Sequence, residues 1–223
     1  LLTRKPTELS GGEKQRVALG RAIAKQPLIY LLDEPLSNID TSLRNDLRAE
    51  ITQLQKNLKT TLIYVTHDQQ EALSMSDRIA ILKEGRVLQI GTPEEIYNHP
   101  QTTWIGTFIG NPPMNVLNGK ISDTNIVISD SLKFSIDDDV KQKLLDYDKK
   151  DIVIGIRPEE IHTQSYPNTV SLNIKSDFLE IFGDTVVTRF TLANQKLLVK
   201  TSVAESIPSD HKYNLYFKNN KFM

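Results

Sequence analysis

The octapeptide LSGGEKQR at residues 9–16 is the most specific stretch of this sequence. Ser10 and Glu13 have the S-x-x-E spacing of a capping box, so a helix is predicted to begin here. Gly11 and Gly12 lie in its first turn, where the lack of a Cβ lets the backbone approach another molecule closely. Because free N–H groups and the positive end of the helix dipole meet at this point, the stretch predicts an anion site. A capped surface helix without a ligand is the alternative.

The composition bounds the class of protein. The 223 residues, of which 39% are hydrophobic and 25% charged, suffice for one large domain or two modest ones. A net charge of −1 predicts no nucleic-acid partner, and the lack of Cys excludes disulfides and thiolate metal sites. The apolar run at residues 28–32 is too short to cross a bilayer. Since the first residue is not Met and the chain starts as if within an element, we expect a fragment.

Downstream of the octapeptide, a helix is predicted over residues 12–25, and Gln26-Pro27 ends it. The run Leu28–Leu32 is typical of a strand that is buried on both faces, as in a parallel sheet. This strand runs directly into Asp33 and Glu34. Two adjacent carboxylates would therefore lie at the C-terminal edge of a sheet, where α/β folds place their ligands. The alternative is that the acidic pair is only the solvated end of a strand.

A turn, a helix and a second strand follow the acidic pair. Residues 36–40 are turn-prone, and Asp40 is a candidate N-cap for the next helix. That helix carries apolar residues at spacings of three and four (Leu43, Leu47, Ile51, Leu54 and Leu58), while Arg44, Arg48 and Glu50 fall elsewhere. The β-rich run at residues 61–66 ends at His67-Asp68. A single His after a strand is commonly structural, so His67 alone assigns no function.

The pattern changes near residue 110. Before it, a hairpin with glycine at its turn is predicted over residues 79–91, and Thr92–Glu95 has the form of a capping box. After it, short strands dominate, with one short helix near residues 140–146. This pattern predicts a small β-barrel or sandwich and a domain boundary near residue 110. The predicted strands are 125–129, 152–156, 170–174, 186–192, 196–201 and 213–217.

Taken together, these motifs resemble those of ATP-binding cassette (ABC) ATPases. Residues 9–16 resemble the signature, 28–35 the Walker B motif, 66–73 the H-loop, and 36–40 the D-loop, with Ile39 where Leu is usual. Several other stretches are similar to the ATPase subunits of sugar-type importers, such as those for maltose, multiple sugars and glycerol 3-phosphate. They are Arg4-Lys5-Pro6, residues 91–97, Phe108-Ile109-Gly110, Met114-Asn115 and residues 155–159.

This resemblance implies an α/β fold class. Residues 1–110 would form the C-terminal half of a P-loop NTPase (ABC ATPase) domain. Residues 111–223 would form a small all-β, OB-like (TOBE) regulatory domain. The site roles follow from the motifs: Glu34 as general base, His67 as the contact to the γ-phosphate and the attacking water, and Asp33 as the Mg²⁺ ligand. The residues expected at ATP are Ser10, Gly11, Gly12, Glu13, Gln15 and Asp40, with Ser10, Gly11 and Gly12 reaching a γ-phosphate held by a partner subunit.

One departure from the family pattern limits how much of the ATP site this chain can form. No G-x-x-x-x-G-K-[ST] occurs, and the single Gly-Lys pair, Gly119-Lys120, is followed by Ile121. Such a loop cradles the phosphates and supplies a lysine. The chain therefore carries half of an ATP site and is expected to be inactive alone.

The resemblance also implies partners and a location. These are a second copy or a paired ABC ATPase subunit, transmembrane permease subunits, indirectly a solute-binding protein, and no nucleic acid. The complete protein would lie at the cytoplasmic face of the membrane and couple ATP hydrolysis to import, with sugars favoured. The alternatives are import of polyamine, phosphate or metal ions, a soluble ABC ATPase of DNA repair or translation, and a purely binding or regulatory module.

Overall fold

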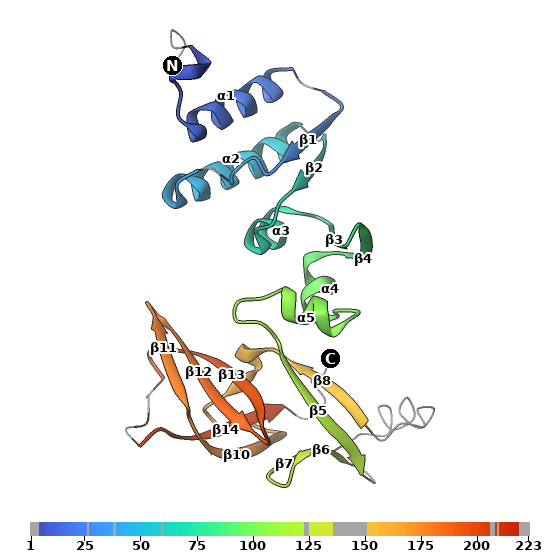
Figure 1. The fold of residues 1–223 in the computed structure, drawn as a ribbon, viewed down its shortest axis with the longest axis vertical. Coiled ribbons are helices and arrows are strands. Elements are labelled where there is room, and N and C mark those ends of the chain that lie inside the picture. Colours follow the sequence, from blue (N-terminus) through green and yellow to red (C-terminus); the bar gives the residue numbers. More distant parts are fainter. Residues whose placement is uncertain are drawn as a thin grey trace. The chain divides into compact units, whose positions relative to one another are not determined.

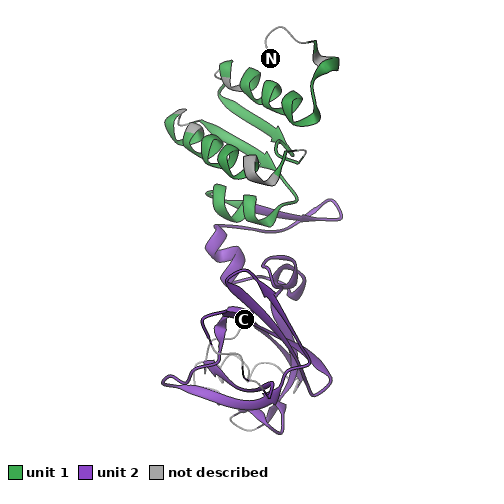
Figure 2. Ribbon diagram, turned by 90° about the vertical axis from the view of Figure 1, so that its left-hand side faces the viewer, with its two compact units in different colours: residues 1–79 green, residues 80–223 purple. Residues whose placement is uncertain are grey.

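The computed structural model describes residues 5–25, 27–37, 39–58, 60–122, 125–135, 151–205, 208 and 210–218. The chain divides into two compact units, Leu1–Ile79 and Ala80–Met223 (Figure 2). The predicted boundary near residue 110 stays a prediction, and the helix predicted near residues 140–146 lies outside the described residues. Within the described parts, no helix is both long and apolar enough to span a bilayer.

The first unit alternates helices and strands, as predicted. After a short 3₁₀ turn at Pro6–Glu8, helix α1 spans Gly11–Ala24 and strand β1 spans Ile29–Asp33. The rest of the unit is α2 (Thr41–Leu58), β2 (Thr61–Val65) and α3 (Gln69–Met75) (Figure 1). Strands β1 and β2 are parallel, from Ile29 opposite Thr61 to Asp33 opposite Val65. Both strands therefore end at the same edge of the sheet.

The core of this unit covers only one face of the sheet. Leu36, Ile39, Leu47 and Ile51 are buried, and Leu19, Leu32, Leu62, Tyr64 and Met75 pack against them. The prediction that residues 28–32 are buried on both faces is wrong in this structure. Side chains alternate along a strand, and the alternate set is exposed: Ile29 by 54%, Leu31 by 73%, Ile63 by 51% and Val65 by 52%.

The second unit begins with a hairpin and two short helices. Strands β3 (Ile79–Lys83) and β4 (Arg86–Gly91) pair across Glu84 and Gly85, whose φ values of 50° and 74° suit a tight hairpin turn. Helix α4 (Pro93–Asn98) has the predicted capping box, in which Thr92 and Glu95 bond each other's backbone N–H. Helix α5 spans Thr103–Phe108.

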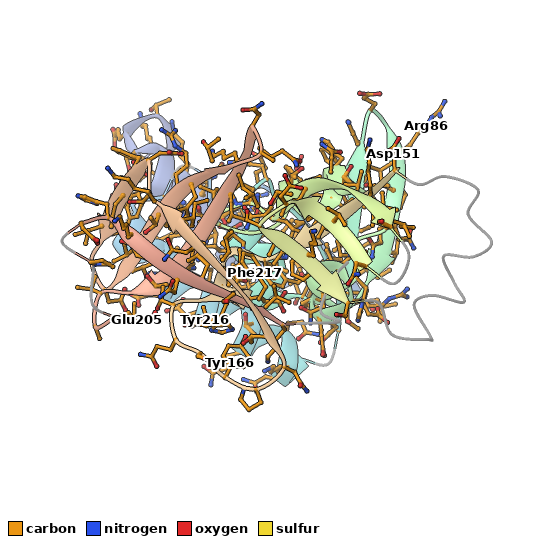
Figure 3. The ribbon with its side chains drawn as sticks, turned by 90° about the horizontal axis from the view of Figure 1, so that it is seen from below. Arg86, Asp151, Tyr166, Glu205, Tyr216 and Phe217 are labelled. Atoms are coloured by element: carbon orange, nitrogen blue, oxygen red, sulfur yellow. The ribbon has the colours of Figure 1, made fainter. Side chains whose placement is uncertain are left out.

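The described residues of the remainder form three antiparallel sheets around one core. Their strand orders are β7-β6-β5-β8, β11-β12-β13 and β10-β14-β9. Asn115 joins two of these sheets, because its side chain accepts from Leu198 N at 2.7 Å and donates to Leu198 O at 2.8 Å. Figure 3 shows this region from below, with Phe217 among the side chains that fill the core. The bounds are β5 Asn115–Ser122, β6 Asn125–Ser129, β7 Leu132–Ser135, β8 Asp151–Ile156, β9 Ile161–His162, β10 Thr169–Lys175, β11 Phe178–Phe182, β12 Thr185–Leu192, β13 Gln195–Ser202 and β14 Lys212–Lys218.

All six strands predicted here are present. Four described strands of these sheets were not predicted: β5, β7, β9 and β11. In β5, Asn118, Gly119 and Lys120 interrupt the apolar alternation, and β7 and β9 have only four and two residues. The residues of β11 are mostly exposed on both faces, so no buried stripe marks it.

A buried arginine connects the helices of this unit to its sheets. Arg157 is 1% exposed and donates to the carbonyls of Gly106 (2.9 Å), Tyr97 (2.6 Å) and Ile109. Its guanidinium also stacks 4.0 Å from the centre of the Tyr97 ring. Since a buried charge needs such partners, α4 and α5 are part of the stable unit and not a loose linker.

Candidate functional site

The parallel sheet brings Glu34 and His67 together. Glu34 follows β1, and its N–H donates to the carbonyl of Val65 at 2.9 Å, which extends the ladder by one bond. The φ of Glu34 is 43°, a conformation that non-glycine residues adopt rarely. His67 follows β2, and its Nδ1 lies 2.9 Å from Oε1 of Glu34. The structure thus joins two residues that the sequence placed at the ends of separate strands.

This pair is open to solvent. The side chains of His67 and Glu34 are 74% and 48% exposed. The hydrogen bond to Glu34 and then the negative charge of its carboxylate raise the pKa of His67 above the usual value. An accessible carboxylate beside an imidazole can accept a proton from a bound water and orient that water.

The predicted capping box is present at the start of α1. Ser10 N donates to Oε2 of Glu13 at 2.8 Å, and Glu13 N donates to Oγ of Ser10 at 3.3 Å. Ser10 and Gly11 are exposed, while Gly12 is half-buried. This end of the 14-residue helix therefore presents backbone and a hydroxyl group to solvent.

Gln15 connects this helix to the carboxylate turn. Its Nε2 donates to the carbonyl of Glu34 at 3.3 Å and to Oγ of Ser37 at 3.2 Å, and Ser37 Oγ donates to the same carbonyl at 3.0 Å. Gln15 was expected as a ligand-binding residue. In this structure its amide supports the backbone of the turn that carries Glu34.

Asp33 and Asp40 lie on either side of this turn. Both are exposed, and the carbonyl of Asp40 accepts from Arg44 N at 2.9 Å at the start of α2, where an N-cap residue belongs. No group of three or more metal-binding side chains occurs among the described residues. Mg²⁺ commonly takes only one or two protein carboxylates and completes its shell with phosphates and water, so the single carboxylate of Asp33 fits such an ion.

Two charged residues that hold the His67 turn, one partly buried and one buried, were not predicted as part of the site. Arg48, on α2, donates to Oδ2 of Asp68 at 2.7 Å and lies 3.5 Å from Oε1 of Glu71. Glu71 is 4% exposed. No sequence signal indicated that Glu71 is buried, because ionised side chains are mostly exposed and are rarely buried unless paired. Nothing in the sequence identified Arg48 as its partner.

Comparison with known proteins gives two family matches and many relatives. Residues 1–37 match the family described as ABC transporter, and residues 110–161 match the MalK OB fold domain. The oligosaccharides import ATP-binding protein MsmX of Bacillus subtilis is 42% identical over 99% of this chain and 62% of its own length. The trehalose/maltose import ATP-binding protein MalK of Thermococcus litoralis is 47% identical over 73% of this chain and 44% of its own length.

A third relative is the sulfoquinovosyl glycerol transport ATP-binding protein SmoE of Agrobacterium fabrum. It is 38% identical over 90% of this chain and 56% of its own length. The chain thus spans less than two thirds of each of these relatives.

Proposed function

Since this chain belongs to the ABC transporter ATP-binding proteins and carries an OB domain of the MalK type, we propose that the complete protein hydrolyses ATP to drive sugar import through membrane permease subunits. The cargo class rests on the names of the relatives, which refer to oligosaccharides, trehalose or maltose, and sulfoquinovosyl glycerol. The protein would act at the cytoplasmic face of the membrane, held there by the permease.

The observation that carries the reaction is the 2.9 Å contact between Glu34 and His67. Glu34 would accept the proton of the attacking water, and His67 would hold that water and the γ-phosphate in line. This division of roles suits phosphoryl transfer, in which positioning and charge stabilisation supply most of the catalysis. The exposure of both side chains leaves room for a nucleotide.

The signature would serve a second subunit. Ser10, Gly11 and Gly12 present a helix N-terminus to solvent, a favourable place for a phosphate. Glu13 holds that terminus through the capping box, and Gln15 ties the helix to the Glu34 turn. We therefore place ATP between this surface and the phosphate cradle of a paired subunit, with Asp40 near the same interface.

The exposed apolar face of the β1–β2 sheet would be covered in the complete domain. Ile29, Leu31, Ile63 and Val65 would pack against further elements of the complete domain that cover this face of the sheet. The complete domain would also add strands to the sheet and supply the phosphate-binding loop. Asp33 would hold Mg²⁺ at the edge of that larger sheet. The ion, once bound there, would neutralise phosphate charge.

The proposed sharing of sites can be tested with mixed dimers of the full-length protein. With Ser10→Arg in one subunit and Glu34→Gln in the other, one of the two sites keeps an intact base and an intact signature. With both changes in the same subunit and a wild-type partner, each site loses one of them.

We expect the split dimer to release phosphate at roughly half the wild-type rate, and the same-subunit dimer at about 1% of it or less. Equal rates in the two dimers would reject the head-to-tail site. The cargo is tested separately, by uptake of labelled maltose, maltotriose, putrescine, phosphate and Mn²⁺ in cells with and without the gene. Gene-dependent uptake confined to a non-sugar would overturn the sugar assignment.

A further inference from the structure

His67 is exposed to solvent, yet the residues on both sides of it are held by buried and partly buried groups. Its ring is 74% exposed, and Glu34 is the partner with which it forms a hydrogen bond in the structure. An imidazole on a surface turn would ordinarily sample several positions. The 2.9 Å contact with Glu34 therefore depends on how the turn that carries His67 is held.

Asp68, the residue after His67, accepts hydrogen bonds with both carboxylate oxygens. Its Oδ2 accepts from Nη2 of Arg48 at 2.7 Å, and its Oδ1 accepts from Gln70 N at 2.8 Å, which caps helix α3. Arg44 adds a longer contact of 3.8 Å to Oδ2. Asp68 thus ties the His67 turn to α2 on one side and to α3 on the other.

Thr66, the residue before His67, is held through Glu71. Its hydroxyl donates to Oε2 of Glu71 at 2.6 Å and accepts from Asp68 N at 3.0 Å. The hydroxyl of Tyr64 donates to the same Glu71 oxygen at 3.0 Å. Burial, followed by the charge of Glu71, raises the pKa of Tyr64, so its hydroxyl stays protonated as this bond requires.

Arg48 is the common point of both sets of contacts. Its side chain is 15% exposed, and those of Asp68 and Glu71 are 26% and 5% exposed. One guanidinium nitrogen, Nη2, faces both carboxylates, at 2.7 Å and 3.5 Å. In such a partly desolvated place, removal of the Arg48 guanidinium leaves Asp68 and Glu71 without their closest cation, so both sets of contacts should loosen together.

We propose that Arg48, Asp68 and Glu71 form a clamp that positions His67 against Glu34 and thereby sets the rate of ATP hydrolysis. None of the three contacts the reacting atoms in this arrangement, so they are positioning residues. The effect on rate rests on the proposed function, whereas the effect on the His67 ring does not. Misplacing a catalytic group by about 1 Å can cost about 100-fold in rate.

The test uses Arg48→Met and Arg48→Lys in the full-length protein, with Lys56→Met as the matched control. Lys56 lies on the same helix, two turns further on, and is exposed. We expect Arg48→Met to lower kcat at least 10-fold with KM for ATP within twofold of wild type. Arg48→Lys should recover part of the loss, because a single ammonium still reaches Asp68. Lys56→Met should stay within twofold of wild type.

A double-mutant cycle with His67→Ala separates positioning from a general loss of stability. If the clamp acts through His67, Arg48→Met causes no further loss of kcat in the His67→Ala background. A full additional 10-fold loss there would overturn the proposal, as would an unchanged kcat in the single variant. If Arg48→Met does not fold, Glu71→Gln replaces it in the same cycle, because it keeps the shape of the side chain and removes the charge.

A second measurement does not depend on hydrolysis. The ring Cε1–Hε1 NMR signal of His67, assigned by its loss in His67→Ala, is recorded without nucleotide at one pH. Arg48→Met, or Glu71→Gln in its place, should shift or broaden this signal, and Lys56→Met should not. If the wild type lacks ATPase activity, the proposed function fails while this signal still decides whether the clamp positions His67. An unchanged signal would overturn the clamp.

Discussion

Nδ1 of His67 lies 2.9 Å from Oε1 of Glu34, although 33 positions of the chain separate the two residues. The contact forms because β1 and β2 are parallel and in register to Asp33 and Val65, so the next residues of both strands meet at one edge. In the proposed function, this carboxylate and this imidazole would form a preorganised pair for water activation.

Replacing the carboxylate of Glu34 tests its role as the base. Glu34→Gln in the full-length protein should retain ATP binding and lower turnover by about two orders of magnitude or more, because the amide cannot accept the proton of the water. Single-turnover phosphate release and equilibrium binding of labelled ATP measure the two effects. Near-normal turnover in this variant would reject Glu34 as the base.

The same substitution should change the titration of His67. The pKa of His67 is raised above 6.5 by the hydrogen bond and the charge of Glu34, so Glu34→Gln should bring it back toward 6.5. Because the folded-state pKa is the higher one, the stabilising effect of the contact is complete below pH 6.5. It is lost as the pH rises through the raised value.

NMR titration of the histidine rings measures this change, and His99, His162 and His211 serve as internal references. An identical His67 titration in both proteins would mean that the contact with Glu34 does not form in solution.

Gln15 offers a test of the link between α1 and the Glu34 turn. Gln15→Ala removes the donor to Glu34 O and Ser37 Oγ, so we expect kcat to fall about 3- to 10-fold with ATP affinity within twofold. Lys14→Ala, at the neighbouring exposed position, is the control and should leave both quantities unchanged. A loss of affinity without a change in kcat would instead favour direct contact of Gln15 with the nucleotide.

The contacts of the buried Arg157 lead to a prediction about which fragment of the second unit is stable. Residues 80–223 should melt cooperatively, whereas residues 111–223 lack the carbonyls of Tyr97, Gly106 and Ile109 that Arg157 uses. The shorter piece also lacks the Tyr97 ring that covers the guanidinium. Because a hydrogen bond to a charged group contributes about 1.5–3 kcal/mol, the shorter piece should be less stable by a few kcal/mol. Urea unfolding followed by circular dichroism measures both.

Arg157→Met supplies the matched comparison. It should destabilise residues 80–223 but have little effect on, or stabilise, residues 111–223. Equal stability of the two unsubstituted pieces would mean that α4 and α5 do not support the sheets.

Two glycines of the second unit give a further stability test. Gly110 has a φ of +116°, and a Cβ there would lie 2.8 Å from Nη1 of Arg157, whereas Gly183 has a φ of +62° and open space around it. We expect Gly110→Ala to lower the free energy of unfolding by about 3 kcal/mol and Gly183→Ala by about 1 kcal/mol. Urea unfolding of residues 80–223 measures both, and equal losses would contradict the close approach of Arg157 to Gly110.

Features that depend on residues close together in the chain could be predicted from the sequence. The capping boxes at Ser10 and Thr92, the hairpin turn at Gly85 and the strands that end at Asp33 and Val65 all depend on residues within one turn or one strand. Local rules of capping, turn chemistry and alternation therefore locate them without knowledge of the rest of the chain.

Only the tertiary structure decided which distant groups meet. It placed Arg48 beside Asp68 and Glu71, gave Arg157 three backbone acceptors, and left one face of the β1–β2 sheet exposed. Each of these outcomes depends on how elements separated by many residues pack, and a charged side chain carries no local mark of the partner it will find. The residues of the candidate site could be named from the sequence, but their distances, their burial and the groups that hold them are properties of the packed fold.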